Sequence, residues 1–243
     1  MASARRSTRD RVRARVNEPN RVRERYERRK HDPRPLYHPL DPSTYMRVQE
    51  KERKLIRLLV SCGLTPLRDK RVLDVGCGSG GDLLQLVRLG FDPHKLVGCD
   101  LLEERADAAR HRLPAACSVL TGDAATLSFE EESFDIVMQS TVFTSLLDID
   151  YQKQLADRMW QLTNEGGGIV WYDFAYDNPR NPDVRGIPLR RVRELFPAAE
   201  VRVWRTTLAP PISRRVTPIH PQLYGVFNAL PLLRTHLLCW IAR

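Results

Sequence analysis

The twelve residues Arg71-Val-Leu-Asp-Val-Gly-Cys-Gly-Ser-Gly-Gly-Asp82 decide the fold class of this chain. The apolar run at 72–75 is typical of a buried strand, and the glycines after it permit a tight turn. Leucine and valine then recur at helical spacing from Leu83. The stretch therefore predicts a strand, a glycine-rich loop and a helix, which together begin a βαβ unit.

The rest of the chain repeats this alternation of short apolar runs with helical patterns. Because strands that alternate with helices form parallel sheets covered on both faces, we expect a binding crevice at the carboxyl ends of the strands. After Phe174 the chain becomes rich in proline and asparagine, and we expect an irregular segment between the last two strands. The further strands are expected at 96–100, 118–123, 134–139, 168–174, 200–207 and 234–243, and the helices at 41–62, 102–112 and 151–162.

The glycine loop admits two interpretations. Gly76, Gly78 and Gly81 satisfy G-x-G-x-x-G, a weak signal for a dinucleotide. Asp74, however, would repel a pyrophosphate and suits a cationic ligand instead. With Gly78 and Gly80 it makes D-x-G-x-G-x-G, and this segment resembles the class I S-adenosylmethionine-dependent methyltransferases. The later segments 171–187, 207–211 and 233–236 resemble a type-11-like bacterial branch of that family, which acts on small molecules.

The resemblance covers residues 70–174 and implies a fold, a cofactor and its binding residues. The fold is α/β and Rossmann-like, with a seven-stranded, mostly parallel sheet, a C-terminal antiparallel hairpin and helices on both faces. The cofactor is S-adenosyl-L-methionine, and the product is S-adenosyl-L-homocysteine. Asp74 would favour the ammonium, Asp100 would accept from the ribose hydroxyls and Asp123 from the adenine amino group. The full expected set is Asp74, Gly76, Cys77, Gly78, Gly80, Asp100, Leu101, Asp123, Ala124 and Gln139.

We expect the methyl acceptor to be bound by the polar loop that follows the fifth strand, with the helix at 41–62 closing over the cofactor crevice. Asp173 is the first candidate base and His236 the second, with Tyr172 beside them. Alternatively, Asp173 orients Tyr172 or a loop amide, His236 belongs to the core, and the asparagines before proline form turns beside solvated arginines. The expected acceptor-binding residues are Tyr37, Tyr45, Asn178, Arg180, Asn181 and Arg185.

The histidines outside that site show no metal-ligand spacing, and Gln139 stands where a metal-dependent branch of the family carries an acid, so we expect no metal. The five cysteines are scattered and odd in number, which favours reduced thiols in a cytoplasmic protein. No run reaches the roughly 18 apolar residues that a membrane-spanning helix needs.

The net charge of +9 is concentrated at the N-terminus. Residues 1–30 contain twelve Lys or Arg and four Asp or Glu, a net charge of +8, so residues 31–243 carry only +1. Such a segment is expected to be disordered or a charge-rich helix. It could bind RNA or an anionic membrane through phosphate contacts, or it could order only against the body or a partner. No aromatic residues interleave the arginines as a base-stacking platform would require.

These observations predict a basic tail at 1–33 and a methyltransferase domain at 34–243. Within the domain we expect an N-terminal helix at 41–62, a cofactor core at 70–174, acceptor elements at 175–230 and a last strand at 231–243. The leading hypothesis is methyl transfer to an oxygen, of a hydroxyl or carboxylate, in a polar small molecule, natural product or glycan precursor. The alternatives are an RNA methyltransferase that uses the tail and a non-catalytic cofactor-binding protein. We expect a monomer or a homodimer.

Overall fold

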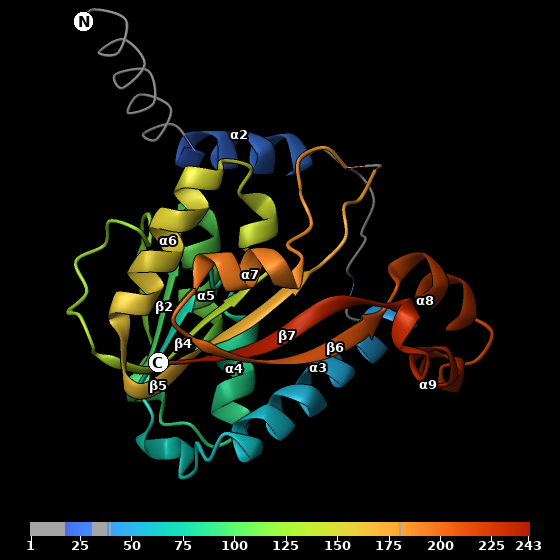
Figure 1. Ribbon diagram of the computed structural model, residues 1–243, viewed down its shortest axis with the longest axis horizontal. Helices are drawn as coiled ribbons and strands as arrows, with labels where there is room; N and C mark the ends of the chain where they lie inside the picture. Colours follow the sequence, from blue (N-terminus) through green and yellow to red (C-terminus); the bar gives the residue numbers. More distant parts are fainter. Residues whose placement is uncertain (1–17, 31–37, 39, 180) are drawn as a thin grey trace, which may run out of the picture.

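The computed structural model describes residues 18–30, 38, 40–179 and 181–243 of the chain. Its centre is one seven-stranded sheet with the order β3-β2-β1-β4-β5-β7-β6 (Figure 1). Strands β1 to β5 run parallel, and β7 pairs antiparallel with both β5 and β6. The strands are β1 Val72–Val75, β2 Leu96–Asp100, β3 Ser118–Thr121, β4 Phe134–Ser140, β5 Thr163–Phe174, β6 Glu200–Leu208 and β7 Arg234–Ala242.

This topology confirms the expected parallel core with a C-terminal antiparallel hairpin. The strands lie close to their predicted positions, because β1 and the centre of β4 are apolar runs that the sheet buries. One expectation is wrong. The proline-rich segment between the last two strands contains two short helices, α8 (Pro210–Val216) and α9 (Gln222–Asn228). Prolines begin α8, where the missing N–H has no partner within the helix to lose.

Helices cover both faces of the sheet (Figure 1). Neighbouring residues of a strand point to opposite faces, so Tyr172 packs with α3 and α4, while Trp171 packs with α6 and α7. Asp173 follows Tyr172 and therefore faces the side of α6. The helices of the first face are α3 (Pro42–Ser61), α4 (Gly81–Arg88) and α5 (Glu103–Arg112), and those of the second are α6 (Ile149–Leu162) and α7 (Leu189–Leu195).

Residues 18–30 of the predicted basic tail form helix α2 (Glu18–Lys30), which packs against the body (Figure 1). The tail was expected to be disordered or a charge-rich helix, and residues 18–30 form a helix that is packed against the rest of the protein. The reason is a single inward face, on which Val22 is buried and Tyr26 packs against the core, while most of the charges point outward. The net charge of the segment does not indicate that such an inward face exists.

Helices α8 and α9 form a cap that is anchored to α3 by the buried carboxylate of Glu50. Glu50 accepts hydrogen bonds from the Tyr224 hydroxyl (2.6 Å), the Asn228 amide (2.8 Å) and the Thr206 hydroxyl (2.7 Å). The backbone N–H of Thr207 donates to both of its oxygens. A buried carboxylate with this many donors is satisfied in place, so it joins the cap, β6 and α3 into one unit.

Candidate active site

A pocket lies at the carboxyl ends of the central strands, between the glycine loop and α2. Its wall on the side of α2 is formed by Pro19, Val22 and Tyr26, a contribution that the sequence did not predict. The sequence assigned the closing role to the helix at 41–62, but α3 does not line this pocket. Of the ten expected cofactor-binding residues, the pocket is lined by Gly76, Asp100, Leu101, Asp123 and Ala124.

The loop between β1 and α4 contains three glycines with left-handed φ angles, and two of them lie nearest the pocket. Gly76 and Gly78 have φ angles of +70° and +54°, in the left-handed region that side chains disfavour. A Cβ at Gly76 would lie 2.5 Å from Cγ2 of Val142, and one at Gly78 would lie 2.5 Å from the guanidinium of Arg105. Glycine therefore lets the loop backbone pack closely against Val142 and Arg105, two residues that line the pocket together with Gly76.

Two carboxylates at the strand ends are held in fixed orientations. Asp100 accepts from the backbone N–H groups of Gly78 and Leu102, both at 2.9 Å. Asp123 accepts from the Tyr151 hydroxyl and from the backbone N–H two residues further along the chain. Each carboxylate has about four lone-pair sites, so both keep acceptor capacity toward the pocket that they line. This arrangement suits a ligand with hydroxyl and amino donors.

Asp74 lies at the end of β1 and is 1% exposed. Burial, and next the negative charge of Asp82, raise its pKa well above the usual range, and Oδ1 has no hydrogen-bond partner. A buried carboxyl oxygen without a partner is costly unless a donor or cation approaches it. Asp74 thus fits an ammonium group, and with the two strand-end carboxylates it fits S-adenosylmethionine, as the resemblance implies.

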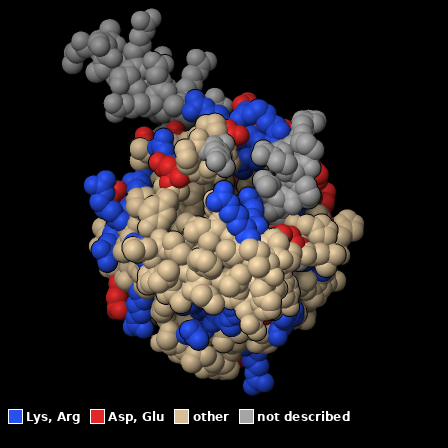
Figure 2. All heavy atoms as spheres, turned by 90° about the vertical axis from the view of Figure 1, so that its right-hand side faces the viewer, with Lys and Arg blue, Asp and Glu red and all other residues tan. Residues whose placement is uncertain are grey.

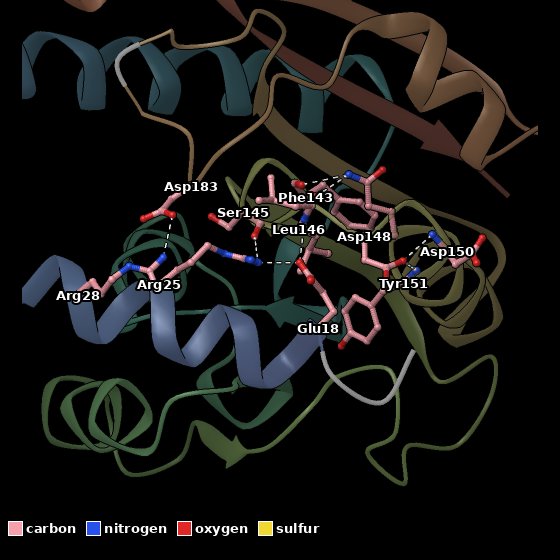
Figure 3. A network of polar contacts seen from close by, with 12 residues as sticks. Glu18, Arg25, Arg28, Phe143, Ser145, Leu146, Asp148, Asp150, Tyr151 and Asp183 are labelled. Carbon is pink, nitrogen blue, oxygen red and sulfur yellow. Dashed lines mark hydrogen bonds and ion pairs between the residues drawn. The ribbon is translucent and has the colours of Figure 1, made fainter. Parts of the chain in front are cut away.

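Helix α2 is fastened over the pocket by a buried polar latch of Glu18, Arg25, Ser145 and Leu147 (Figure 3). Arg25 Nη2 donates to Glu18 Oε1 at 2.6 Å and to the carbonyl oxygen of Ser145 at 2.9 Å. Glu18 Oε1 also accepts from the backbone N–H of Leu147 at 2.8 Å. The latch joins α2 to the segment between β4 and α6, and that segment forms part of the pocket wall.

A second contact joins α2 to the loop after β5. Asp183 in that loop accepts from Arg28 at 2.9 Å, and its carbonyl oxygen accepts from Arg29 (Figure 3). Arg25, Arg28 and Arg29 of the predicted tail therefore serve contacts within the chain. The sequence offered no sign of these pairings, because the partners are more than 100 residues apart.

The structure describes four of the six expected acceptor-binding residues, and none of these four lines the pocket. Asn181 accepts from the N–H of Asp183 and donates its own N–H to the carbonyl oxygen of Asn178, which is the turn geometry of the alternative interpretation. Arg185 is exposed, and Tyr45 lies on α3 with 55% of its surface exposed. The remaining two, Tyr37 and Arg180, lie outside the described residues.

A cluster of polar side chains, the Lys51 cluster, adjoins the pocket and consists of Lys51, Asp82, Ser140, Tyr172 and His236. Lys51 Nζ donates to Asp82 at 2.6 Å and to Ser140 Oγ at 2.8 Å, and it lies 4.7 Å from the centroid of the Tyr172 ring. His236 stacks on the same ring with centroids 5.1 Å apart. Because Ser140 also lines the pocket, the cluster begins where the pocket ends.

Tyr172 and His236 are both uncharged at neutral pH. Burial, with the positive charges of Arg47 and Lys51 adding to it, lowers the pKa of His236 to about 3. Burial likewise raises the pKa of Tyr172, whose hydroxyl is 2.7 Å from the hydroxyl of Thr207. The charged members of the cluster are therefore Lys51 and Asp82, which form an ion pair. Sequence reasoning missed Lys51, because it is one of several cations in a charge-rich helix and belongs to no motif.

Asp173 lies on the other face of the sheet and is fully buried. One of its oxygens accepts from the backbone N–H of Thr144 at 3.4 Å, and burial raises its pKa to about 7. Gln139 is also fully buried, and its Oε1 accepts from the N–H of Val142 at 3.0 Å. Both side chains hold the loop after β4, and the structure does not bring Asp173 together with Tyr172 and His236.

Cys77, Gly78 and Gly80 shape the glycine loop without lining the pocket. The N–H of Cys77 donates to the carbonyl oxygen of Cys99, and its buried thiol has a raised pKa. The described residues include no group of three or more His, Cys, Asp or Glu side chains that could hold a metal ion. In the same part of the chain, no helix combines the length and apolar character needed to cross a membrane.

Similarity to known proteins agrees with this geometry. Residues 72–167 match the family described as methyltransferase domain. The chain is 34% identical over 140 residues to a phthiotriol/phenolphthiotriol dimycocerosates methyltransferase from Mycobacterium ulcerans, covering 56% of this chain and 50% of that protein. It is 28% identical to a tRNA U34 carboxymethyltransferase from Pectobacterium carotovorum, covering 58% and 44%. The chain thus spans about half the length of the curated relatives it matches.

The fold is also similar to that of solved methyltransferase structures. A crystal structure of an S-adenosylmethionine-dependent methyltransferase from Mesorhizobium loti superimposes with a TM-score of 0.58 and 17% identity, covering 77% of this chain and 96% of that one. At 17% identity, this similarity shows that the fold is shared and supports no statement about the acceptor.

Proposed function

We propose that the protein transfers a methyl group to an oxygen of a polar small molecule, natural product or glycan precursor. The premise is the match of residues 72–167 to the family described as methyltransferase domain, together with the class I order of the strands. The acceptor oxygen belongs to a hydroxyl or a carboxylate. The observation that carries this proposal is the Lys51 cluster, which meets the pocket at Ser140. S-adenosylmethionine, when bound, supplies a methyl group on a positively charged sulfur.

Two carboxylates that line the pocket, and the buried Asp74 behind it, divide the work of holding this cofactor. Asp100 accepts from the ribose hydroxyls, Asp123 from the adenine amino group, and Asp74 faces the ammonium. The support for these roles is the orientation of the first two carboxylates and the unpartnered oxygen of the third. Helix α2 excludes water from the same space, since Val22 and Tyr26 form its wall.

The cluster favours an acceptor oxygen that already carries negative charge, such as a carboxylate. A histidine with a pKa of about 3 is a weak base, and Tyr172 keeps its proton. Lys51 can pair with an anionic acceptor, and methyl transfer then depends mainly on positioning. In this scheme Tyr172 and His236 contact and orient the acceptor. Asp173 is a positioning residue that holds the loop after β4.

The names of the relatives do not agree on one acceptor. The Mycobacterium protein is named for phthiotriol dimycocerosates and the Pectobacterium protein for tRNA U34. An RNA acceptor bound by the tail is less favoured, because three arginines of α2 are engaged with Glu18, Ser145 and Asp183. The acceptor must therefore be found by experiment.

The test is to incubate the protein with methyl-labelled S-adenosylmethionine and a size-fractionated cell extract. We expect label in the low-molecular-mass fraction, and loss of that label in mild alkali would identify a methyl ester of a carboxylate. Alkali-stable label would indicate a hydroxyl acceptor. Nuclease-sensitive label in large molecules would refute the proposal in favour of RNA. Binding of S-adenosylhomocysteine without any labelled product would favour a non-catalytic protein.

A matched pair of variants tests the role of the cluster. Lys51→Gln is expected to raise the KM for the labelled acceptor while leaving the affinity for S-adenosylhomocysteine unchanged. Lys54→Gln, on the same helix but outside the cluster, is the control. Equal kinetics of the two variants would remove Lys51 from the acceptor site.

A further inference from the structure

The cap exposes apolar side chains on the face shown in Figure 2. Ile219, Val226, Leu230 and Leu232 are between 57% and 92% exposed, and they come from α9 and the turns on either side of it. The start of α3 adjoins them through contacts with α8 and through the hydrogen bond between the Ser43 and Ser213 hydroxyls. We call Ile219, Val226, Leu230 and Leu232 the cap face.

The cap face is bordered by positive charge. The cap, residues 209–233, contains two arginines and no Asp or Glu, and Arg234 next to it donates to the carbonyl oxygen of Asn228. Arg214 and Arg215 of α8 are exposed. Figure 2 shows a broad uncharged area across this side of the molecule with Lys and Arg side chains above and below it. A surface of this kind complements an anionic partner that also accepts apolar side chains.

We propose that the cap face binds the surface of an anionic lipid bilayer. Exposed leucine, isoleucine and valine side chains enter the boundary between headgroups and acyl chains, while arginines pair with lipid phosphates. The protein would lie on the bilayer and not cross it. Association with a second copy fits the charges less well. A two-fold contact through this face would bring Arg214 and Arg215 of two caps together, with no acid in the cap residues 209–233 to pair with them.

The position of the cap face also places a membrane close to the acceptor end of the site. Glu50 joins the cap to Thr207, and the Thr207 hydroxyl contacts Tyr172 of the Lys51 cluster. One layer of side chains therefore separates the cap from the cluster. Vesicle binding can be measured without any methyl transfer, so the inference stands or fails independently of the proposed function.

The test is co-sedimentation of the full chain with vesicles of phosphatidylcholine alone and of phosphatidylcholine mixed with phosphatidylglycerol. We expect binding to the mixed vesicles only, with partitioning reduced about tenfold in the double variant Leu230→Asp/Leu232→Asp. Arg214→Glu/Arg215→Glu should weaken it similarly. All of these side chains are exposed, so the variants should fold, which circular dichroism checks.

Matched controls carry the same changes elsewhere on the surface. Val60→Asp/Ile149→Asp alters two exposed apolar residues outside the cap face, and Arg68→Glu/Arg190→Glu alters two exposed arginines. Both controls should bind like the wild type, and all variants keep the same N-terminal arginines. The inference is overturned if the wild type does not bind, or if cap and control variants behave alike. It is also overturned if light scattering shows a dimer that Leu230→Asp/Leu232→Asp dissociates, without vesicle binding.

Discussion

Replacing Arg25 with alanine should open the wall that α2 forms over the pocket. The substitution leaves the carboxylate of Glu18, which is 1% exposed, without its cation. Removing one partner of a buried ion pair costs about 3–5 kcal/mol if the other charge stays buried. Val22, the buried apolar side chain of α2, contributes about 1.5–3 kcal/mol. Because the first quantity exceeds the second, we expect the helix to undock.

Undocking removes Pro19, Val22 and Tyr26 from the pocket wall. The loss of apolar contact with the ligand should also amount to about 1.5–3 kcal/mol. Because about 1.4 kcal/mol corresponds to a tenfold change, the Kd for S-adenosylhomocysteine should rise about 10- to 100-fold. The melting temperature should change little, since the sheet and its two layers of helices do not depend on α2.

Isothermal titration calorimetry with S-adenosylhomocysteine measures the affinity, and hydrogen exchange of residues 18–30 reports whether α2 is docked. Arg21→Ala, an exposed position on the same helix, is the control. Adding Glu18→Gln to Arg25→Ala should recover part of the affinity, because the amide oxygen can still accept from the N–H of Leu147 and no charge is buried. The reasoning is refuted if Arg25→Ala binds as tightly as Arg21→Ala and the amides of α2 remain protected.

Three further predictions concern single carboxylates. Asp100→Asn should raise the Kd for S-adenosylhomocysteine at least about tenfold, since hydrogen bonds to charged groups contribute about 1.5–3 kcal/mol; calorimetry checks this, and an unchanged Kd would contradict it. The raised pKa of Asp173, about 7, favours the protonated native state, so its contribution to stability is full below pH 4 and is lost as the pH rises through 7. Asp173→Asn should remove that dependence, up to about 4 kcal/mol between pH 4 and 7 in urea unfolding, whereas parallel pH profiles would contradict the assignment. Glu50→Gln should destabilise the protein by about 1–3 kcal/mol, because its amide N–H groups meet the donors Tyr224 and Asn228 of the cap; a melting temperature equal to that of Glu52→Gln would show that the anchor is dispensable.

Local motifs in the sequence predicted the sheet and the cofactor end of the site. Asp74, the glycine loop and Asp100 lie within 27 residues, and each directly follows or ends a strand whose apolar run is visible in the sequence. Parallel strands bring their carboxyl ends to one edge, so consecutive motifs converge without knowledge of the packing.

The acceptor end depends on contacts that no local pattern contains. Lys51 reaches Ser140 across 89 residues, and Arg25 reaches Ser145 across 120. The charge of residues 1–30 left open whether the segment binds phosphates or orders against the body, because net charge does not show which side chains share a helix face. Asp173 was predicted as a base from its place at the end of β5, but the alternation of side chains turns it away from Tyr172.

The latch of α2 also has a consequence for timing. The helix and the segment between β4 and α6 both line the pocket, so passage of a ligand through this wall requires the buried pair to separate. The strength of the Arg25–Glu18 ion pair would then set how long S-adenosylhomocysteine stays bound. Product release, instead of methyl transfer, would be the slowest step of the catalytic cycle.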